Sequence, residues 1–400
     1  MADQQPTPGT PANPTTPAAD PALSTSIAPP PPPAANPPAQ QPPAPFTLTH
    51  SLNFPELLHQ LGCTLALSTY QAGKVVFVSA SSVDDLVQLP RNFVGAMGVA
   101  LEDTAPGDGS PRMAVACSTE VVCLANSPSL ARTYPKQPNV YDGLFMPRTR
   151  HQTGPLDLHD LCYGEGGLWA VNTRFSCLVR LSDRFGFEPV WKPDFITALE
   201  PEDRCHLNGL TLKDGKPEYV TAIDTTDTAG GWRPRRSEGH GVLIHVPTGK
   251  KVLEGLYMPH SPRLYRDGLF LLSSGTGELL KADLATGKVQ SIAQLNGFAR
   301  GMSRIGDIVY IGVSKLRKKN TTFQELPVSK RSMFAGVAAV DLRGPSVIGW
   351  VKYETSVDEI YDVQVIPGLR RPGIVSAEMP ESSQSIYRPG ASYWANVAKA

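Results

Sequence analysis

The chain has 400 residues, 41% of them hydrophobic, and its 37 Lys and Arg balance 37 Asp and Glu. This balance excludes a generally basic surface, so nucleic acid is not expected as a partner. No apolar run could span a bilayer, and the N-terminus lacks the basic and apolar regions of a signal peptide. We therefore expect a cytoplasmic protein without a membrane partner. The six cysteines form no CxxC pair, which indicates reduced, buried thiols rather than a thiolate metal cluster.

Residues 1–46 form a head dominated by Pro, Ala, Thr and Gln, with five consecutive prolines at 29–33. Such a segment cannot bury enough apolar surface to offset the entropy lost on ordering. We predict a disordered head with polyproline character. It could be a ligand for a partner or a solvated tether, and we assign it no function.

A short helix is predicted where the ordered chain begins. Asn53 has the features of an N-cap, because Glu56 follows three residues later and a proline lies in the first turn. Apolar residues follow at helical spacing, and Gly62 can end the helix.

After Gly62, short apolar runs alternate with Gly, Pro, Asp and Asn, a pattern typical of many small antiparallel strands. Residues 64–70 and 75–79 are predicted to form a hairpin. Similar hairpins are expected at residues 167–181, at 219–223 with 241–246, at 268–274 with 278–283, and at 307–313 with 336–342.

Each hairpin set is preceded by a short strand that starts with polar residues and continues with apolar ones. The six starts are Ala96, His159, His206, His260, Arg300 and Tyr361. Their spacing of roughly 40 to 60 residues fits blades of four strands. The sequence therefore predicts an all-β fold, a six-bladed β-propeller.

Too little chain follows Tyr361 to complete a blade. Residues 64–79 and 86–89 precede the first start and can supply the missing strands, which would close the ring and remove exposed edges. The propeller is placed at 47–378 and a C-terminal extension at 379–400. Seven blades remain the alternative if the leading strands form a blade of their own.

Five motifs resemble those of an uncharacterised bacterial family, catalogued as conserved hypothetical and placed among the β-propellers. They are STYQAGK (68–74), GLWAVNT (167–173), DRCHLNG (203–209), MPHSPR (258–263) and EIYDVQV (359–365). The resemblance covers nearly everything after the head and implies the propeller fold, with no established activity. Short motifs such as Asn208-Gly209-Leu210 give a looser likeness to gluconolactonase-like and NHL-type six-bladed propellers.

Three of the eight histidines begin consecutive inner strands: His159, His206 and His260. Inner strands of a propeller run along the channel, so their starts should converge at one mouth. Neutral imidazoles there could bind a divalent metal and leave a position open for water or substrate. Oxygen ligands at similar positions are Asp160, Asn208, Glu359 and Asp362. Alternatively, each histidine is structural and bonds a loop carbonyl.

Without a metal, the same residues permit acid–base chemistry, because histidine titrates near neutral pH and a carboxylate can orient it. His159 beside Asp160 would be the acid–base pair, and Tyr361 a further proton donor. Arg300 or Arg263 would stabilise an anionic oxygen. Such a site suits a lyase, an epimerase or a lactone hydrolase acting on a polar or acidic substrate.

Two basic loops, at residues 232–236 and 315–319, are expected to project from a face. There they could hold an acidic sugar, a phosphate or a nucleic-acid backbone, or remain solvated. Trp232 beside Arg233 suits stacking on a sugar or a base.

Common catalytic motifs (HExxH, GxSxG, and GxGxxG before a helix) are missing from the sequence, and residues 71–74 fit a hairpin turn better than a phosphate loop. Two functions remain: a small-molecule enzyme or binder at the channel mouth, and a non-catalytic scaffold that binds a protein partner through its faces and basic loops.

Overall fold

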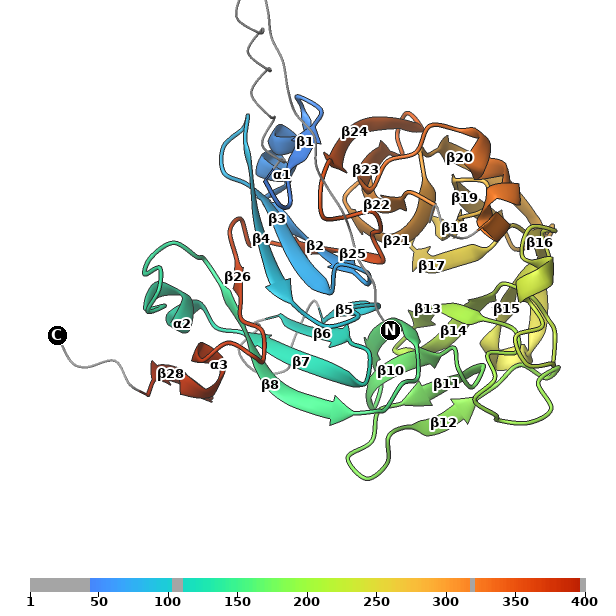
Figure 1. Ribbon diagram of the computed structural model, residues 1–400, viewed down its shortest axis with the longest axis horizontal. Helices are drawn as coiled ribbons and strands as arrows, with labels where there is room; N and C mark the ends of the chain where they lie inside the picture. Colours follow the sequence, from blue (N-terminus) through green and yellow to red (C-terminus); the bar gives the residue numbers. More distant parts are fainter. Residues whose placement is uncertain (1–43, 103–110, 317–320, 396–400) are drawn as a thin grey trace, which may run out of the picture. The chain divides into compact units, whose positions relative to one another are not determined.

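Six antiparallel sheets, one for each predicted inner-strand start, surround a central channel in the computed structural model (Figure 1). The structure describes residues 44–102, 111–316 and 321–395. The six-bladed propeller is confirmed, and the seven-bladed alternative is wrong. Residues 1–43 of the predicted disordered head lie outside the described residues.

Each blade has four strands, which follow one another from the channel outwards. Blade 1 contains β25 (Asp362–Pro367), β2 (Cys63–Thr69), β3 (Lys74–Ala80) and β4 (Leu86–Asn92). Blade 2 contains β5 (Val99–Glu102), β6 (Arg112–Ala116), β7 (Glu120–Asn126) and β8 (Leu144–Gln152). Blade 3 contains β9 (Leu158–Gly164), β10 (Gly167–Asn172), β11 (Cys177–Arg180) and β12 (Glu188–Trp191).

The other three blades follow the same order. Blade 4 contains β13 (Leu207–Lys213), β14 (Lys216–Ala222), β15 (Gly241–His245) and β16 (Lys250–Leu256). Blade 5 contains β17 (Pro259–Tyr265), β18 (Gly268–Ser273), β19 (Glu278–Asp283) and β20 (Lys288–Gln294). Blade 6 contains β21 (Phe298–Ile305), β22 (Ile308–Ser314), β23 (Gly336–Asp341) and β24 (Ser346–Tyr353).

The ring closes in blade 1, where strands far apart in the chain pair as predicted. β25 is antiparallel to β2 from Cys63 opposite Pro367 to Ser68 opposite Asp362. Two short strands, β1 (Leu48–His50) and β26 (Gly373–Ile374), add to the outer edges of blades 6 and 2. These additions cover backbone groups that would otherwise be open to pairing with another chain.

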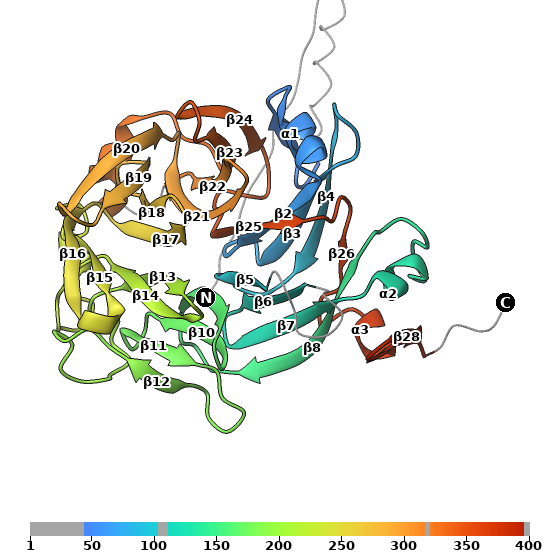
Figure 2. The same ribbon diagram turned by 180° about the vertical axis from the view of Figure 1, so that it is seen from behind.

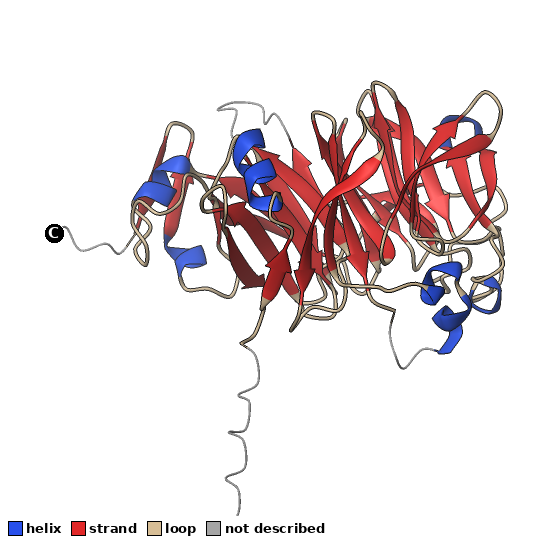
Figure 3. Ribbon diagram, turned by 90° about the horizontal axis from the view of Figure 1, so that it is seen from above, coloured by secondary structure: helices blue, strands red, loops and turns tan. Residues whose placement is uncertain are grey.

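Short helices and one further hairpin lie outside the sheets. The helical segments are α1 (Phe54–Leu61), α2 (Pro128–Arg132), α3 (Glu381–Gln384), η1 (Arg233–Arg235), η2 (Val246–Thr248), η3 (Thr321–Glu325) and η4 (Pro327–Lys330). The hairpin joins β27 (Ser385–Arg388) to β28 (Ala391–Trp394), and β28 packs on α2 beside blade 2 (Figures 1 and 2). Figure 3 shows the strands as the body of the ring, with the helical segments at its margins. In the described part of the chain, every helix is too short or too polar to cross a membrane.

The core lies between neighbouring blades, so a strand can be covered on both faces. β2 is buried along its whole length, and Phe54 of α1 packs edge-on against Tyr310 at 5.8 Å between ring centroids. Each large apolar side chain buried in this way contributes about 1.5–3 kcal/mol. Gly62 ends α1 with a φ of 60°, as predicted. Asn53 is the N-cap of α1, as predicted, but its side chain makes no capping hydrogen bond; its amide donates to the Ile348 carbonyl instead and ties α1 to β24.

Glycines allow the inner strands to approach one another closely at the channel. A Cβ at Gly301 would lie 2.5 Å from the Asp362 Cα, and one at Gly209 would lie 2.4 Å from the Pro262 Cδ. Gly301 also has a φ of 75°, which favours glycine. These contacts hold the starts of the inner strands close together.

Hydroxyl groups near the end of a second strand link several blades to the inner strand of the next blade. We call these groups the latches, and they are Ser68, Thr173, Ser274 and Ser314. Their hydroxyls donate to the carbonyls of Met97, Leu207, Ala299 and Ile360, respectively, at 2.5–3.1 Å. The latches fix the segments that carry the predicted site residues.

Candidate functional site

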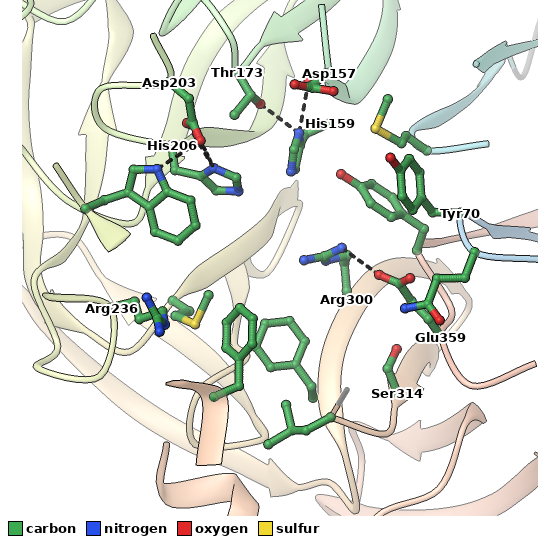
Figure 4. Close-up of a pocket in the computed structure, with 18 of the residues that line it drawn as sticks. Tyr70, Asp157, His159, Thr173, Asp203, His206, Arg236, Arg300, Ser314 and Glu359 are labelled. Atoms are coloured by element: carbon green, nitrogen blue, oxygen red, sulfur yellow. Dashed lines mark hydrogen bonds and ion pairs between the residues drawn. The ribbon is translucent and has the colours of Figure 1, made fainter. Parts of the chain in front are cut away.

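The starts of the inner strands open onto a cavity of about 540 Å³, to which every blade contributes (Figure 4). This volume lies within the range of small-molecule sites. The predicted site residues that line the cavity are His159, His206, Trp232, Arg233, Arg300, Glu359 and Tyr361.

His206 is held by a carboxylate. Its Nδ1–H donates to Asp203 at 3.0 and 3.1 Å, and the same carboxylate accepts from the Trp232 indole and from Arg233, each at 2.9 Å. In Figure 4 the other ring nitrogen of His206 points into the cavity. The backbones of Asp203 and His206 both have positive φ, 49° and 52°. Such strain in non-glycine residues often accompanies functional sites.

His159 is held by neutral groups instead. Its Nδ1–H lies 2.9 Å from the Asp157 carbonyl and 2.8 Å from the Thr173 hydroxyl. A carbonyl can only accept, so the proton is on Nδ1, and Nε2 carries a lone pair that faces Arg300 in Figure 4. Burial, followed by the charges of His206 and Arg300, lowers the pKa of His159 well below its usual value. His159 is therefore a neutral hydrogen-bond acceptor.

His260 repeats this arrangement deeper in the channel. Its Nδ1–H donates to the Met258 carbonyl at 2.9 Å and lies 2.8 Å from the Ser274 hydroxyl. Burial, followed by the charge of Arg300, lowers its pKa well below the usual value. His260 is 2% exposed and does not line the large cavity.

Arg300 provides a cation at the centre of the site. Its guanidinium lies 3.3 Å from Glu359 and 4.4 Å from the centroid of the Tyr361 ring. Burial raises the pKa of Tyr361 well above its usual value, so this residue stays a phenol. Tyr361 can therefore donate a proton in a hydrogen bond but cannot act as a base.

Three charged residues predicted for the site instead form an inner ion cluster, defined as Asp160, Arg263 and Asp362. The Asp160 carboxylate accepts from Arg263 at 2.9 Å and from two backbone N–H groups. Asp362 also accepts from two backbone N–H groups, and burial followed by the charge of Asp160 raises its pKa. The predicted acid–base pair of His159 with Asp160 is wrong, because Asp160 bonds β13 and β17 instead.

Arg263 and Asn208, predicted to bind substrate, also lie below the cavity. Arg263 donates to the carbonyls of Leu210, Pro262 and Met302 as well as to Asp160. The Asn208 Oδ1 accepts from Thr221 at 2.7 Å. The structure thus brings seven of the predicted residues to the large cavity, whereas Asp160, Asn208, His260, Arg263 and Asp362 do not line it.

The first basic loop contributes Trp232, Arg233 and Arg236 to the lining of the cavity, although Arg233 and Pro234 remain exposed. Trp232 is 5% exposed and lies against His206 with ring centroids 4.2 Å apart, so it is not an open stacking surface. Arg233 lies over Trp232, and Arg236 lies over Phe323. In the second loop, Lys315 pairs with Asp358, and residues 317–319 lie outside the described residues.

No three His, Cys, Asp or Glu side chains among residues 44–102, 111–316 and 321–395 are grouped so that they could hold a metal ion. The rings of His159 and His206 have centroids 4.7 Å apart, but His260 lines a smaller void that His206 does not line. The proposed oxygen ligands Asp160 and Asp362 are occupied by backbone N–H groups. The structure gives no support to a metal site, which stays a prediction.

Several residues of the site were missed from the sequence. Asp203 could have been predicted from the sequence, because it precedes His206 by three residues in the same motif. Thr173 could not be assigned from the sequence, since its hydroxyl meets His159 only after β9 and β10 pair. Arg236 was recognised as basic but not as a lining residue.

Comparison of the sequence with known protein families gives one match. A domain of unknown function, DUF4915, matches residues 52–375. The chain belongs to this family. The resemblance to an uncharacterised propeller family is therefore confirmed.

Other comparisons add little to the DUF4915 assignment. A search of curated proteins finds no match. Among solved structures, the chain is similar to one chain of a crystal structure of a nidogen/laminin complex, at 10% identity and a TM-score of 0.45, covering 77% of this chain and 99% of the other. A similarity at this level indicates nothing about the partners of the DUF4915 propeller.

Proposed function

We propose that the DUF4915 propeller binds a small organic anion in the cavity and that His206 is an acid–base group toward it. The observation that carries the proposal is the contact between His206 and Asp203, which orients the imidazole and leaves its other nitrogen toward the cavity. A carboxylate behind a histidine fixes the orientation of the ring and leaves its other nitrogen free to exchange a proton with a ligand.

The charge of the lining supports an anionic ligand. The cavity contains Arg233, Arg236, Arg300 and Lys315, and each of these except Arg236 pairs with a carboxylate of the described residues. The guanidinium of Arg236 lies over Phe323, and its Nε has no hydrogen-bond partner in the described part of the chain. Burial lowers the pKa of Arg236, the negative charge of Glu325 raises it, and the positive charge of Arg233 lowers it. A ligand carboxylate would give this cation a closer counter-charge.

The same arrangement suits removal of a proton from carbon or from water. His206 would take the proton, and Arg300 would stabilise the oxyanion that develops. Tyr361, as a phenol, would donate a hydrogen bond to it. A lyase, an epimerase or a lactone hydrolase would need these groups. The alternative is a scaffold whose protein partner binds a face and does not depend on the cavity.

Calorimetric titration with glucuronate, gluconate and, as a neutral analogue, glucose tests the binding proposal. We expect the acids to bind more tightly than glucose, and Arg236→Met to weaken acid binding by about 10- to 100-fold through loss of one charged hydrogen bond. Arg331→Met serves as a control, because Arg331 is exposed and is not part of the lining. Equal binding of glucuronate and glucose would contradict the proposal.

The chemical role is tested separately with any acid that binds and turns over. His206→Gln should lower kcat by about 10²- to 10⁴-fold while leaving the Kd within a few-fold. A partner protein captured equally by the wild type, Arg236→Met and His206→Gln would favour the scaffold.

A further inference from the structure

A second void adjoins the cavity on its channel side. It has a volume of about 10 Å³ and shares the side chains of His159, Arg300 and Tyr361 with the cavity. These three residues therefore separate the two spaces. A volume of this size corresponds to about one water molecule.

Four residues that line the void each have a buried polar atom without a hydrogen-bond partner among the described residues. The atoms are Asn208 Nδ2, His260 Nε2, Arg300 Nε and Tyr361 Oη. Asn208, His260 and Tyr361 are 3%, 2% and 5% exposed, so bulk water does not satisfy them. Buried polar groups in proteins are almost always hydrogen-bonded, so four unpaired atoms around one void indicate a bound guest.

The hydrogen-bonding role of each atom follows from its other contacts. The Asn208 Oδ1 accepts from the Thr221 hydroxyl, which leaves the amide N–H groups as donors. His260 donates from Nδ1 to the Met258 carbonyl, so its Nε2 is an acceptor. Arg300 Nε can only donate, and the Tyr361 hydroxyl can donate or accept.

We propose that this void binds one ordered water molecule, which accepts from Asn208 and Arg300 and donates to His260 and Tyr361. Two donors, one acceptor and one group that can be either complement the two lone pairs and two hydrogens of water. The four partners agree with the two to four hydrogen bonds that buried waters make.

Other guests fit the void less well. An anion would meet the carboxylates of Asp160 and Asp362, which line the same space. A cation would meet the guanidinium of Arg300. The water is also no proton relay, because the pKa of Tyr361 is raised and that of His260 is lowered. A proton passing from Tyr361 to His260 would leave a phenolate and an imidazolium, both disfavoured there.

The water restrains the side chain of Arg300 from the side of the smaller void. It occupies the Nε side of the guanidinium, and Arg300 Nη1 bonds to Glu359. Asn208 and His260 are thus positioning residues for Arg300, although neither touches the large cavity. This role does not depend on whether the proposed ligand is correct.

Crystals of the full-length protein, grown with sodium chloride or sodium bromide, test the occupant. We expect one peak of electron density about 2.6–3.2 Å from all four atoms, with no anomalous signal in the bromide crystals. An anomalous peak would show that bromide, an anion, occupies the void instead of water, which would overturn the proposal. An empty void, or side chains rotated to bond one another, would overturn the proposal.

A pair of tyrosine variants tests it in solution. Tyr361→Phe removes one hydrogen bond to the water and should lower the Tm by about 1–2 °C. The control is Tyr353→Phe in β24, because the Tyr353 hydroxyl is also buried and unpaired among the described residues but lines neither void. Its removal should leave the Tm unchanged or raise it. A Tyr361→Phe variant that behaves like Tyr353→Phe would show that no water is bound.

Discussion

The mouth and the interior of the channel are both lined by charged side chains near the starts of the inner strands, but their partners differ. At the mouth, the donors to Asp203 within the described part of the chain are all side chains: His206, Trp232 and Arg233. In the inner ion cluster, Asp160 and Asp362 each accept from one backbone N–H group of their own strand and from one of a neighbouring blade. The interior charges bond the backbone of neighbouring blades, whereas those at the mouth bond other side chains and line the cavity.

The largest effect on stability is expected when a charge is removed from the interior. Asp160→Ala leaves Arg263 buried beside one carboxylate fewer and frees two backbone N–H groups. We expect the free energy of unfolding, measured by urea denaturation, to fall by about 3–5 kcal/mol. Asp203→Asn at the mouth keeps an acceptor and should lose about 1 kcal/mol.

Equal losses in these two variants would contradict the division between a structural interior and a functional mouth. If Asp160→Ala does not fold, Asp160→Asn provides a milder change, and its loss should still exceed that of Asp203→Asn.

The pH dependence of the free energy of unfolding gives a second test of the buried groups in the channel. His159 and His260 have lowered pKa values in the folded protein, so below about pH 6.5 the unfolded chain binds protons that the folded state does not. Each histidine therefore makes its full contribution to the free energy of unfolding above pH 6.5. Below this pH the contribution falls by about 1.4 kcal/mol for each pH unit. The raised pKa of Asp362 acts in the opposite direction, because its contribution is lost as the pH rises.

Urea midpoints at pH 7, 6 and 5 separate these contributions. His260→Gln should flatten the acid side of the profile relative to the wild type, since it removes one of the two histidines and keeps Asp362. An unchanged slope would mean that His260 takes up a proton in the folded state.

The smallest effect is expected at a latch. Thr173→Val removes the hydroxyl that donates to the Leu207 carbonyl and should lower the free energy of unfolding by about 1 kcal/mol. Thr286→Val in an exposed turn, where the hydroxyl bonds Asp283, should change it by less than about 0.5 kcal/mol. Thermal denaturation of both variants measures the difference, and a latch variant as stable as the turn variant would count against the latches.

Much of the fold could be predicted because its signals are local. The turns and the polar starts of inner strands repeat, which indicated the six blades, and Gly62 ends the first helix at a positive φ. Asn53 is the N-cap of α1, as predicted, but its side chain does not cap the helix, because it bonds the carbonyl of Ile348 on a strand 295 residues away in the chain. No local pattern predicts that contact.

The site was predicted in part for the same reason. Equivalent positions on inner strands converge, so His159 and His206 do meet. What each polar residue bonds depends on other blades: Asp160 meets Arg263, which is 103 residues further along the chain. The sequence shows that these side chains are polar, but only the packed ring separates the structural ones from those that face a cavity.

The closing of the ring has a consequence for the order of assembly. Glu359 and Tyr361 immediately precede β25, the last inner strand, which is held in blade 1 by pairing with β2. During synthesis, the first five blade starts emerge from the ribosome before these two residues do. The cavity therefore gains its final wall only when the ring closes, so a chain that stalls or misfolds before that step cannot present a complete site.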